Sequence, residues 1–242
     1  MRSYATDQIA CSEKAAAYFF GDKWKNEGNA VVLHCGVDVT PFYKVPGGRV
    51  IRRQFGIADD TLVVGTVGNL RPEKNHSFFL RIAKSILFRE PGAQFFLIGD
   101  GNKRSELERE ATEMGIGAKV HFLGSRSDVP SLMTGLLDVM VLPSFSEGLP
   151  VTVLESQVAG LPAVVSDRVT REVVFREDLT TFLPLEVGSE VWAATILGAR
   201  KSRRTDIAVG IEKIKGTDFW MGQCARNLAA LYEKAMARAR KP

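Results

Sequence analysis

The chain has 242 residues, of which 45% are hydrophobic and 25% are charged, which is the composition of an ordinary globular protein. A chain of this length can bury one good-sized core. Its formal net charge of +4 is too small to indicate a nucleic-acid partner, and no apolar run approaches the ~20 residues of a membrane span. Three widely spaced cysteines without metal-ligand spacing (Cys11, Cys35 and Cys224) indicate a reduced, cytoplasmic protein.

Short apolar runs typical of buried strands alternate with segments whose apolar residues recur every three or four positions. Strands are predicted over residues 31–34, 62–67, 94–98, 120–123, 139–142 and 163–166, with an edge strand at 181–183. Helices are predicted over residues 75–89, 103–114, 129–137, 151–158, 190–199 and 218–239. A segment rich in proline and glycine, residues 37–49, interrupts the pattern and indicates a connection between domains. The alternation predicts an α/β fold, a Rossmann-like doubly wound parallel sheet covered by helices on both faces.

The most informative stretch, residues 143–156, places two carboxylates, Glu147 and Glu155, on either side of a Gly-Leu-Pro turn. Glu147 falls in the loop at the carboxyl end of a predicted strand, and Glu155 about two turns along the next helix. Ligands of doubly wound sheets bind at this edge, where a helix N-terminus offers free N–H groups and a favourable dipole to a phosphate. Carboxylates beside an anion site suit a ligand that is also rich in hydroxyls, as a sugar nucleotide is.

Further motifs accompany Glu147-Gly-Leu-Pro and Glu155 in order along the chain. They lie at residues 64–75, 96–101, 122–130 and 159–167, preceded by residues 9–14 and 36–38. From about Ile9 to Leu185, this ordered set resembles the retaining GT-B glycosyltransferases of group 1, also called family four, with their E-x7-E signature. That group includes capsular and exopolysaccharide enzymes. The resemblance implies the C-terminal, donor-binding half of a GT-B fold, serving capsule, exopolysaccharide or lipopolysaccharide synthesis.

The resemblance also implies that the chain consists of four parts. Residues 1–36 are expected to be the remnant of the N-terminal domain's last helix and strand, and residues 37–60 the connection. Residues 61–205 are expected to form the Rossmann-like domain for the nucleotide-sugar donor, and residues 206–242 a C-terminal helical segment. A complete GT-B enzyme has two Rossmann-like domains, so the chain is expected to be inactive without its N-terminal half.

The signature residues receive their expected roles from the same resemblance. Glu147 is expected to bind hydroxyls of the transferred sugar near its anomeric carbon. Gly148 and Leu149 would bring backbone N–H groups to the sugar and the distal phosphate, and Thr152 can add an N–H and a hydroxyl. Glu155 is expected to bond both ribose hydroxyls, as acidic residues do in other nucleotide-binding Rossmann domains. The alternative is two ordinary surface carboxylates.

The phosphate loop departs from the family pattern at one position. The family has Gly-Arg followed by a lysine, whereas this chain has Gly68 followed by Asn69, with Arg71 two residues later and then Lys74. Arg71 and Lys74 are assigned to the diphosphate, because fixed cations stabilise the charge that gathers on the leaving group. The alternative is a pair of solvated loop cations beside Glu73.

A third loop follows the strand predicted at residues 120–123. The family uses backbone groups at this place to bind the base, which assigns Gly124, Ser125 and Arg126 to donor binding. Asp128 is predicted to cap the helix that begins there. Residues 99–101 are predicted to be a turn near the site.

No metal-ligand cluster or cofactor fingerprint is found, and the resemblance implies a UDP-, GDP- or ADP-sugar as donor. The acceptor, a glycan or a lipid-linked molecule, would bind through the missing N-terminal domain of a cytoplasmic enzyme. Clusters of basic residues are one possible site of peripheral contact with the inner membrane face. The favoured interpretation is that they are solvated helix ends. These clusters are Arg200, Lys201, Arg203, Arg204, Arg238, Arg240 and Lys241.

Two other functions remain open at this point. A sugar-nucleotide epimerase could share the fold, but it would need further carboxylates and histidines for elimination chemistry. A non-catalytic flavodoxin-like nucleotide-binding module would explain the alternation of strands and helices. It would not explain both glutamates together with Arg71 and Lys74.

Overall fold

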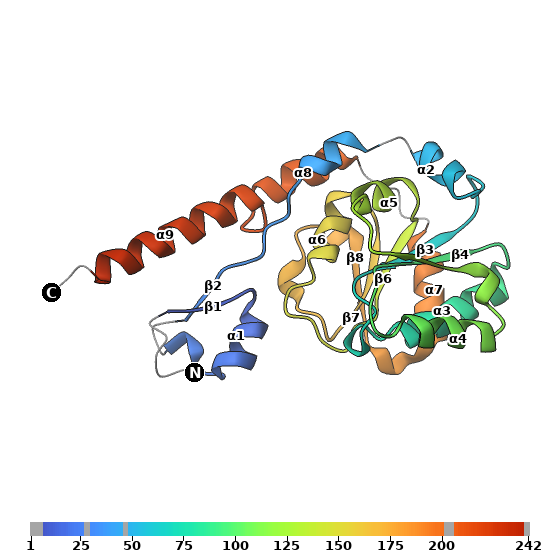
Figure 1. The fold of residues 1–242 in the computed structure, drawn as a ribbon, viewed down its shortest axis with the longest axis horizontal. Coiled ribbons are helices and arrows are strands. Elements are labelled where there is room, and N and C mark those ends of the chain that lie inside the picture. Colours follow the sequence, from blue (N-terminus) through green and yellow to red (C-terminus); the bar gives the residue numbers. More distant parts are fainter. Residues whose placement is uncertain (1–6, 27–29, 46–47, 201–205, 240–242) are drawn as a thin grey trace.

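The computed structural model describes residues 7–26, 30–45, 48–200 and 206–239 (Figure 1). Within these residues, six strands form one parallel sheet in the order β5-β4-β3-β6-β7-β8. The strands are β3 (Val63–Val67), β4 (Gln94–Ile98), β5 (Val120–Gly124), β6 (Val139–Leu142), β7 (Ala163–Ser166) and β8 (Thr180–Leu183). The sheet therefore grows outward from β3 in one direction and then outward from β6 in the other, which is the doubly wound arrangement.

Helices cover both faces of this sheet (Figure 1). One face carries α3 (His76–Arg89), α4 (Arg104–Glu113) and α7 (Gly188–Ala199). The other carries α2 (Gly48–Gln54), α5 (Val129–Gly135), α6 (Val151–Val158) and α8 (Ile207–Lys215). Successive residues of a strand point to opposite faces of the sheet. Val139 and Val141 are therefore buried on the face that carries α3, α4 and α7, whereas Met140 and Leu142 are buried on the face that carries α2, α5, α6 and α8. Burial on both faces explains why these strands read as continuous apolar runs.

A small separate unit precedes the sheet domain. Strands β1 (Gln8–Ala10) and β2 (Ala30–Val32) pair in parallel, and α1 (Glu13–Phe20) connects them in sequence. Ser12 caps α1, because its Oγ accepts a hydrogen bond of 3.0 Å from the N–H of Ala15. This unit has its own small core around Ala16 and Trp24.

The last helix, α9 (Met221–Ala239), runs from the sheet domain back along the first unit (Figure 1). Its start is held by Val37, whose N–H donates to Phe219 O at 2.8 Å and whose carbonyl accepts from Met221 N at 3.1 Å. Near its end, Arg238 forms an ion pair with Asp7. The chain thus crosses twice between the two parts, once before β3 and once at α9.

Several elements differ from the prediction. Residues 30–32, rather than 31–34, form the strand of the first unit, and β1 is an additional strand beside it. Two short helices, α2 and α8, were not predicted as separate elements. The segments 201–205 and 240–242, which hold most of the basic clusters, lie outside the described residues. No helix in the described ranges is long and apolar enough to cross a membrane.

Candidate functional site

The loops that follow β3 and β6 meet at the point where the strand order reverses. The side-chain amide of Asn75 donates to Pro143 O at 3.1 Å, and the N–H of Phe145 donates to Glu73 O at 2.9 Å. Asn75 has a left-handed backbone with φ of 54°, so the loop after β3 turns sharply before α3 begins. Two segments about 70 residues apart in sequence therefore form one edge of the sheet, which is where such folds bind ligands.

Lys74 and Glu147 meet directly at this edge. The Nζ of Lys74 lies 2.7 Å from Oε1 of Glu147, and the hydroxyl of Ser144 donates to the same oxygen at 2.7 Å. Both charged side chains are largely buried, with 19% of Lys74 and 10% of Glu147 exposed. The ammonium has two further donors and the carboxylate further lone pairs, so both can bind another group without leaving the edge.

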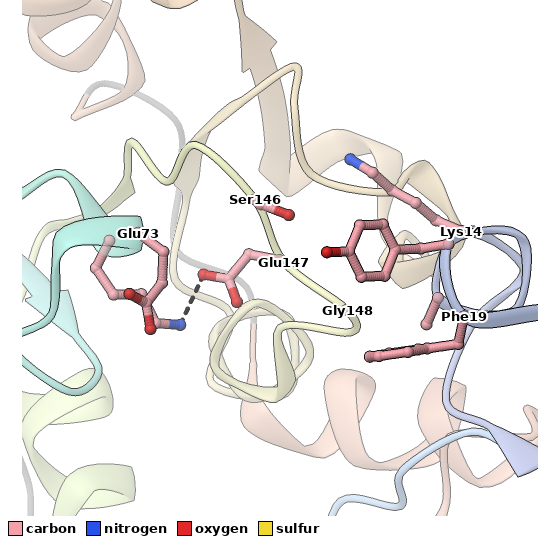
Figure 2. A pocket seen from close by; sticks show the side chains of 9 residues that line it. Lys14, Phe19, Glu73, Ser146, Glu147 and Gly148 are labelled. Carbon is pink, nitrogen blue, oxygen red and sulfur yellow. Dashed lines mark hydrogen bonds and ion pairs between the residues drawn. The ribbon is translucent and has the colours of Figure 1, made fainter. Parts of the chain in front are cut away.

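A cavity of about 440 Å³ opens beside this ion pair (Figure 2). Its lining on the sheet side includes Glu73, Lys74, Ser146, Glu147 and Gly148. Helix α1 supplies the facing side through Lys14, Ala15, Tyr18 and Phe19. The cavity therefore lies between the sheet domain and the first unit, with a charged wall on one side.

Arg71 does not line the cavity that contains Lys74 and Glu147. It lines a neighbouring cavity of about 540 Å³ together with Asn69, Asp100, Gly101 and Asn102. Glu73 lines both cavities. The structure thus brings Lys74 and Glu147 together but places Arg71 on the adjacent side of the same loop.

Glycines allow the ends of β3 and β4 to approach closely. Gly99 has φ of 139°, and a Cβ at this residue would lie 2.0 Å from the carbonyl oxygen of Gly68. The N–H of Gly68 donates to Ile98 O at 2.9 Å, which fixes the start of the phosphate loop. A side chain at residue 99 would therefore push this loop out of place.

The Gly99→Ala variant is expected to lose about 2 kcal/mol or more of unfolding free energy, because alanine is strained at this φ and its methyl group meets the backbone. Gly92→Ala is the matched control, since a Cβ there meets nothing within 4 Å and its φ is not positive. Urea denaturation of both variants measures the difference. Equal stability of the two would contradict the role given to Gly99.

Helix α6 carries the second half of the E-x7-E pair. Pro150 occupies its N-cap position and makes no side-chain cap bond, so the first turn presents backbone N–H groups beside Thr152. Leu149 packs against the core, and a Cβ on Gly148 would lie 3.3 Å from Cys11 Sγ. Gly148 is thus a close-contact point between the two parts of the chain.

Burial raises the pKa of Glu155 to about 7 from an ordinary value of 4.5. The side chain is half-buried on α6, between the buried residues Leu154 and Ser156. The carboxyl group therefore keeps its proton to a higher pH than an exposed glutamate does. Donors that bond to the carboxylate would favour the ionised form and lower its pKa.

The third predicted loop adopts a turn at the end of β5. Gly124 has φ of 67°, and its carbonyl accepts from Gly99 N at 2.9 Å. Arg126 donates to both carboxylate oxygens of Asp128, at 2.8 and 2.7 Å. Asp128 occupies the predicted N-cap position of α5, but its side chain makes no cap hydrogen bond. The bidentate pair with Arg126 takes up the carboxylate instead, and its effect is to lower the pKa of Asp128.

Other site residues escaped the sequence analysis. Tyr18 and Phe19 line the cavity from α1, and Ser144 holds Glu147. The spacing of residues 14, 15, 18 and 19 marks one helix face, but nothing in the sequence connects that face with Glu147. Among the described residues, no group of three or more His, Cys, Asp or Glu side chains could hold a metal ion.

The strand order, with its reversal between β3 and β6, defines a Rossmann-like, doubly wound α/β protein. The family described as glycosyl transferases group 1 matches residues 49–197. The chain belongs to this family, which confirms the predicted membership in glycosyltransferase group 1.

Individual relatives agree with this assignment. The putative glycosyltransferase EpsF of Bacillus subtilis is 36% identical over 203 residues, which cover 83% of this chain and 52% of the relative. The Escherichia coli UDP-Gal:alpha-D-GlcNAc-diphosphoundecaprenol alpha-1,3-galactosyltransferase is 32% identical over 156 residues, covering 63% of this chain and 40% of the relative. The chain thus spans about half the length of these relatives.

The fold agrees with solved structures. The crystal structure of Anabaena Alr3699/HepE in complex with UDP and glucose superposes with a TM-score of 0.79 at 21% identity, over 95% of this chain and 63% of that one. The predicted fold class, a Rossmann-like doubly wound parallel sheet forming the C-terminal half of a GT-B fold, is confirmed.

Proposed function

We propose that this chain binds a nucleoside-diphosphate sugar and supplies the donor side of a retaining glycosyl transfer. The observation that carries the proposal is the pairing of Lys74 Nζ with Glu147 Oε1 at 2.7 Å, where the strand order reverses. Lys74 would bind the diphosphate and Glu147 would accept hydrogen bonds from the sugar hydroxyls. The two residues lie side by side, as the diphosphate and the sugar do in a sugar nucleotide. The Anabaena HepE complex with UDP and glucose supports this choice of ligand.

The proposed transfer breaks the bond between the anomeric carbon and the diphosphate oxygen. A new bond forms from that carbon to an acceptor hydroxyl on the same face of the sugar, and the hydroxyl proton passes to the leaving diphosphate. Lys74 would stabilise the charge that develops on the diphosphate. Glu147 would hold sugar hydroxyls, with backbone N–H groups of Gly148 and Leu149 nearby. Arg71, from the adjacent cavity, would reach the diphosphate from the other side of the loop.

The remaining contacts with the donor are assigned in the same way. We place the phosphates at the N-terminus of α6, where Thr152 adds a hydroxyl, and the ribose hydroxyls on Glu155. The start of the loop at Gly68 and the turn at residues 124–126 would contact the diphosphate and the base through backbone groups. We propose a UDP-, GDP- or ADP-sugar, without a metal or other cofactor.

The organisation of the whole enzyme belongs to the same proposal. Residues 1–36 would end an N-terminal domain, residues 37–60 connect it, residues 61–205 form the donor domain, and residues 206–242 return to the first part. The acceptor would be a glycan or lipid-linked molecule of capsule, exopolysaccharide or lipopolysaccharide synthesis on the cytoplasmic side. The family, the named relatives and the path of α9 support this organisation.

Calorimetric titration of the 242-residue chain with UDP, GDP, ADP and their glucose conjugates tests the proposal. We expect weak binding of one base in preference to the others. Turnover by the chain alone is expected to be absent or very low, because closing a second domain over the donor excludes water and completes such sites. Binding of none of these nucleotides would refute donor binding, and robust sugar transfer would refute the need for a further domain.

A further inference from the structure

One face of α1 carries two aromatic side chains that remain at the surface. Tyr18 is 83% exposed and Phe19 is 61% exposed. Their rings contact each other edge to face, with centroids 5.1 Å apart and an interplanar angle of 87°. Exposed aromatic pairs of this kind mark binding surfaces more often than scattered single residues do.

The core of the first unit does not need these rings. Ala15 and Ala16 are buried in that core with Trp24, and Ala17 and Phe20 pack against it. These residues already cover β1 and β2. The Tyr18–Phe19 pair therefore serves the other side of the helix, where it lines the cavity beside Glu147.

Helix α1 is fastened to the loop that carries Glu147. The hydroxyl of Ser12 donates to Gly148 O at 2.6 Å while it caps the helix, and the N–H of Glu13 donates to Glu172 at 2.9 Å. Lys14 donates to the carbonyl of Arg168. The aromatic face is thus held at a fixed place relative to the carboxylate of Glu147.

The two sides of the cavity differ in chemistry. Figure 2 shows Lys14 and Phe19 of α1 on one side of the cavity and Glu147 and Glu73 on the other. The α1 side carries the rings of Tyr18 and Phe19 beside Lys14 and Ala15, and the other side offers the carboxylates of Glu73 and Glu147 and the hydroxyl of Ser146. A pyranose has the same division, because its C–H groups form an apolar face suited to an aromatic ring while its hydroxyls point outward from the ring.

We propose that Tyr18 and Phe19 form a platform for the acceptor sugar, so that this chain itself holds part of the acceptor site. The inference rests on the proposed function, which places the transferred sugar on Glu147. A molecule that attacks the anomeric carbon of that sugar must approach from the open side of the cavity, where the two rings lie. Because the two rings are nearly perpendicular, the acceptor ring would stack on one of them and contact the other at its edge, with a hydroxyl directed at Glu147 and the transferred sugar. The platform would then contribute to the choice of acceptor.

Saturation-transfer difference NMR tests the platform with the full chain in saturating UDP. Methyl α-D-glucopyranoside and methyl α-D-galactopyranoside are titrated as acceptor probes, and the same titration is repeated without UDP. Tyr18→Ala and Phe19→Ala are each expected to raise the dissociation constant of the preferred glycoside about fivefold, as loss of one ring contact predicts. Tyr18→Phe keeps the ring and is expected to stay within about twofold of the wild-type value, which separates stacking from hydrogen bonding by the phenol.

Phe88→Ala is the matched control, because Phe88 is 91% exposed on α3 and lines neither cavity of the candidate site. UDP affinity is expected to be the same in all variants. If UDP binds but Tyr18→Ala and Phe19→Ala leave glycoside binding unchanged, the platform is refuted and the rings form a packing surface for another part of a longer protein. Failure of the wild-type chain to bind either glycoside in the presence of bound UDP refutes it equally. Failure of UDP itself to bind overturns the proposed function instead, and the titration without UDP then decides the platform separately.

Discussion

Lys74→Ala is expected to weaken binding of the preferred nucleoside diphosphate by about tenfold to a hundredfold. A charge-assisted bond from a largely buried ammonium to phosphate is worth about 1.5–3 kcal/mol, and each 1.4 kcal/mol is a factor of ten. The loss has a second source, because the variant leaves the carboxylate of Glu147, which is 10% exposed, without its cation. An uncompensated negative charge would then face the diphosphate.

Two variants make this experiment specific. Lys84→Ala removes an exposed lysine from α3, and its affinity should stay within about twofold of the wild type because surface charges contribute little. In a Glu147→Gln background, Lys74→Ala should cost less than it does alone, because no unpaired carboxylate remains. Calorimetry of the four combinations at residues 74 and 147 gives the coupling between them. Unchanged affinity in Lys74→Ala would remove this residue from the site.

The buried elements of the sheet could be predicted from the sequence, and the reason is burial. Strands β6 and β7 and helix α6 have the predicted bounds, since each has strong apolar patterning bounded by proline or glycine. The helices α2 and α8 mix glycine and charged residues with their apolar ones, and neither follows a predicted strand of the sheet, so the alternation did not mark them as separate elements. The local apolar pattern thus predicts the strands and helices that form the core, but few of the segments that connect them.

The sequence predicts the part of the candidate site that is determined by the positions of the strand ends. Lys74 and Glu147 belong to loops after β3 and β6, and the strand order makes these loops neighbours. Their direct ion pair was not predictable, because it depends on side-chain reach across the two loops. Asp128 makes no cap hydrogen bond for a similar reason, since Arg126 two residues earlier takes up the carboxylate with two hydrogen bonds.

The contribution of α1 could not be predicted at all. Tyr18 and Phe19 lie about 130 residues before Glu147 in the sequence, in a unit whose strands do not join the main sheet. Bonds from Ser12, Glu13 and Lys14 hold that unit against the site. Contacts of this kind between separately folded parts leave no periodic signal in the sequence.

The ionised form of Glu155 is expected to favour ribonucleotide binding but to lower the unfolding free energy. Burial raises its pKa to about 7 in the folded protein, against an ordinary value of 4.5. Between these two values the folded state binds more protons than the unfolded state, so the unfolding free energy falls as the pH rises from about 4.5 to about 7. Above pH 7 the folded protein carries the full cost of a buried carboxylate, up to about 3 kcal/mol.

Glu155→Gln should therefore stabilise the protein at pH 8 by up to about 3 kcal/mol and have little effect at pH 4, because glutamine resembles the protonated acid at every pH. Urea denaturation at both values measures the difference, and groups that titrate in both proteins cancel. Glu113→Gln, whose side chain is 69% exposed, is the matched control and should show no such pH dependence. Equal stabilisation by Glu155→Gln at pH 4 and pH 8 would contradict the buried carboxylate.

The same variant is expected to lose ribonucleotide binding by about tenfold or more, since two ribose hydroxyls would no longer meet a charged acceptor. Binding of inorganic pyrophosphate, which has no ribose, should stay within about twofold of the wild-type value. Wild-type affinity for a nucleotide sugar should rise between pH 6 and pH 8, because ribose hydroxyls favour the ionised carboxylate and binding then releases a proton. In Glu155→Gln this rise should be absent. An equal loss for ribonucleotide and pyrophosphate would place Glu155 outside the ribose site, and the burial of its carboxyl would then need another cause.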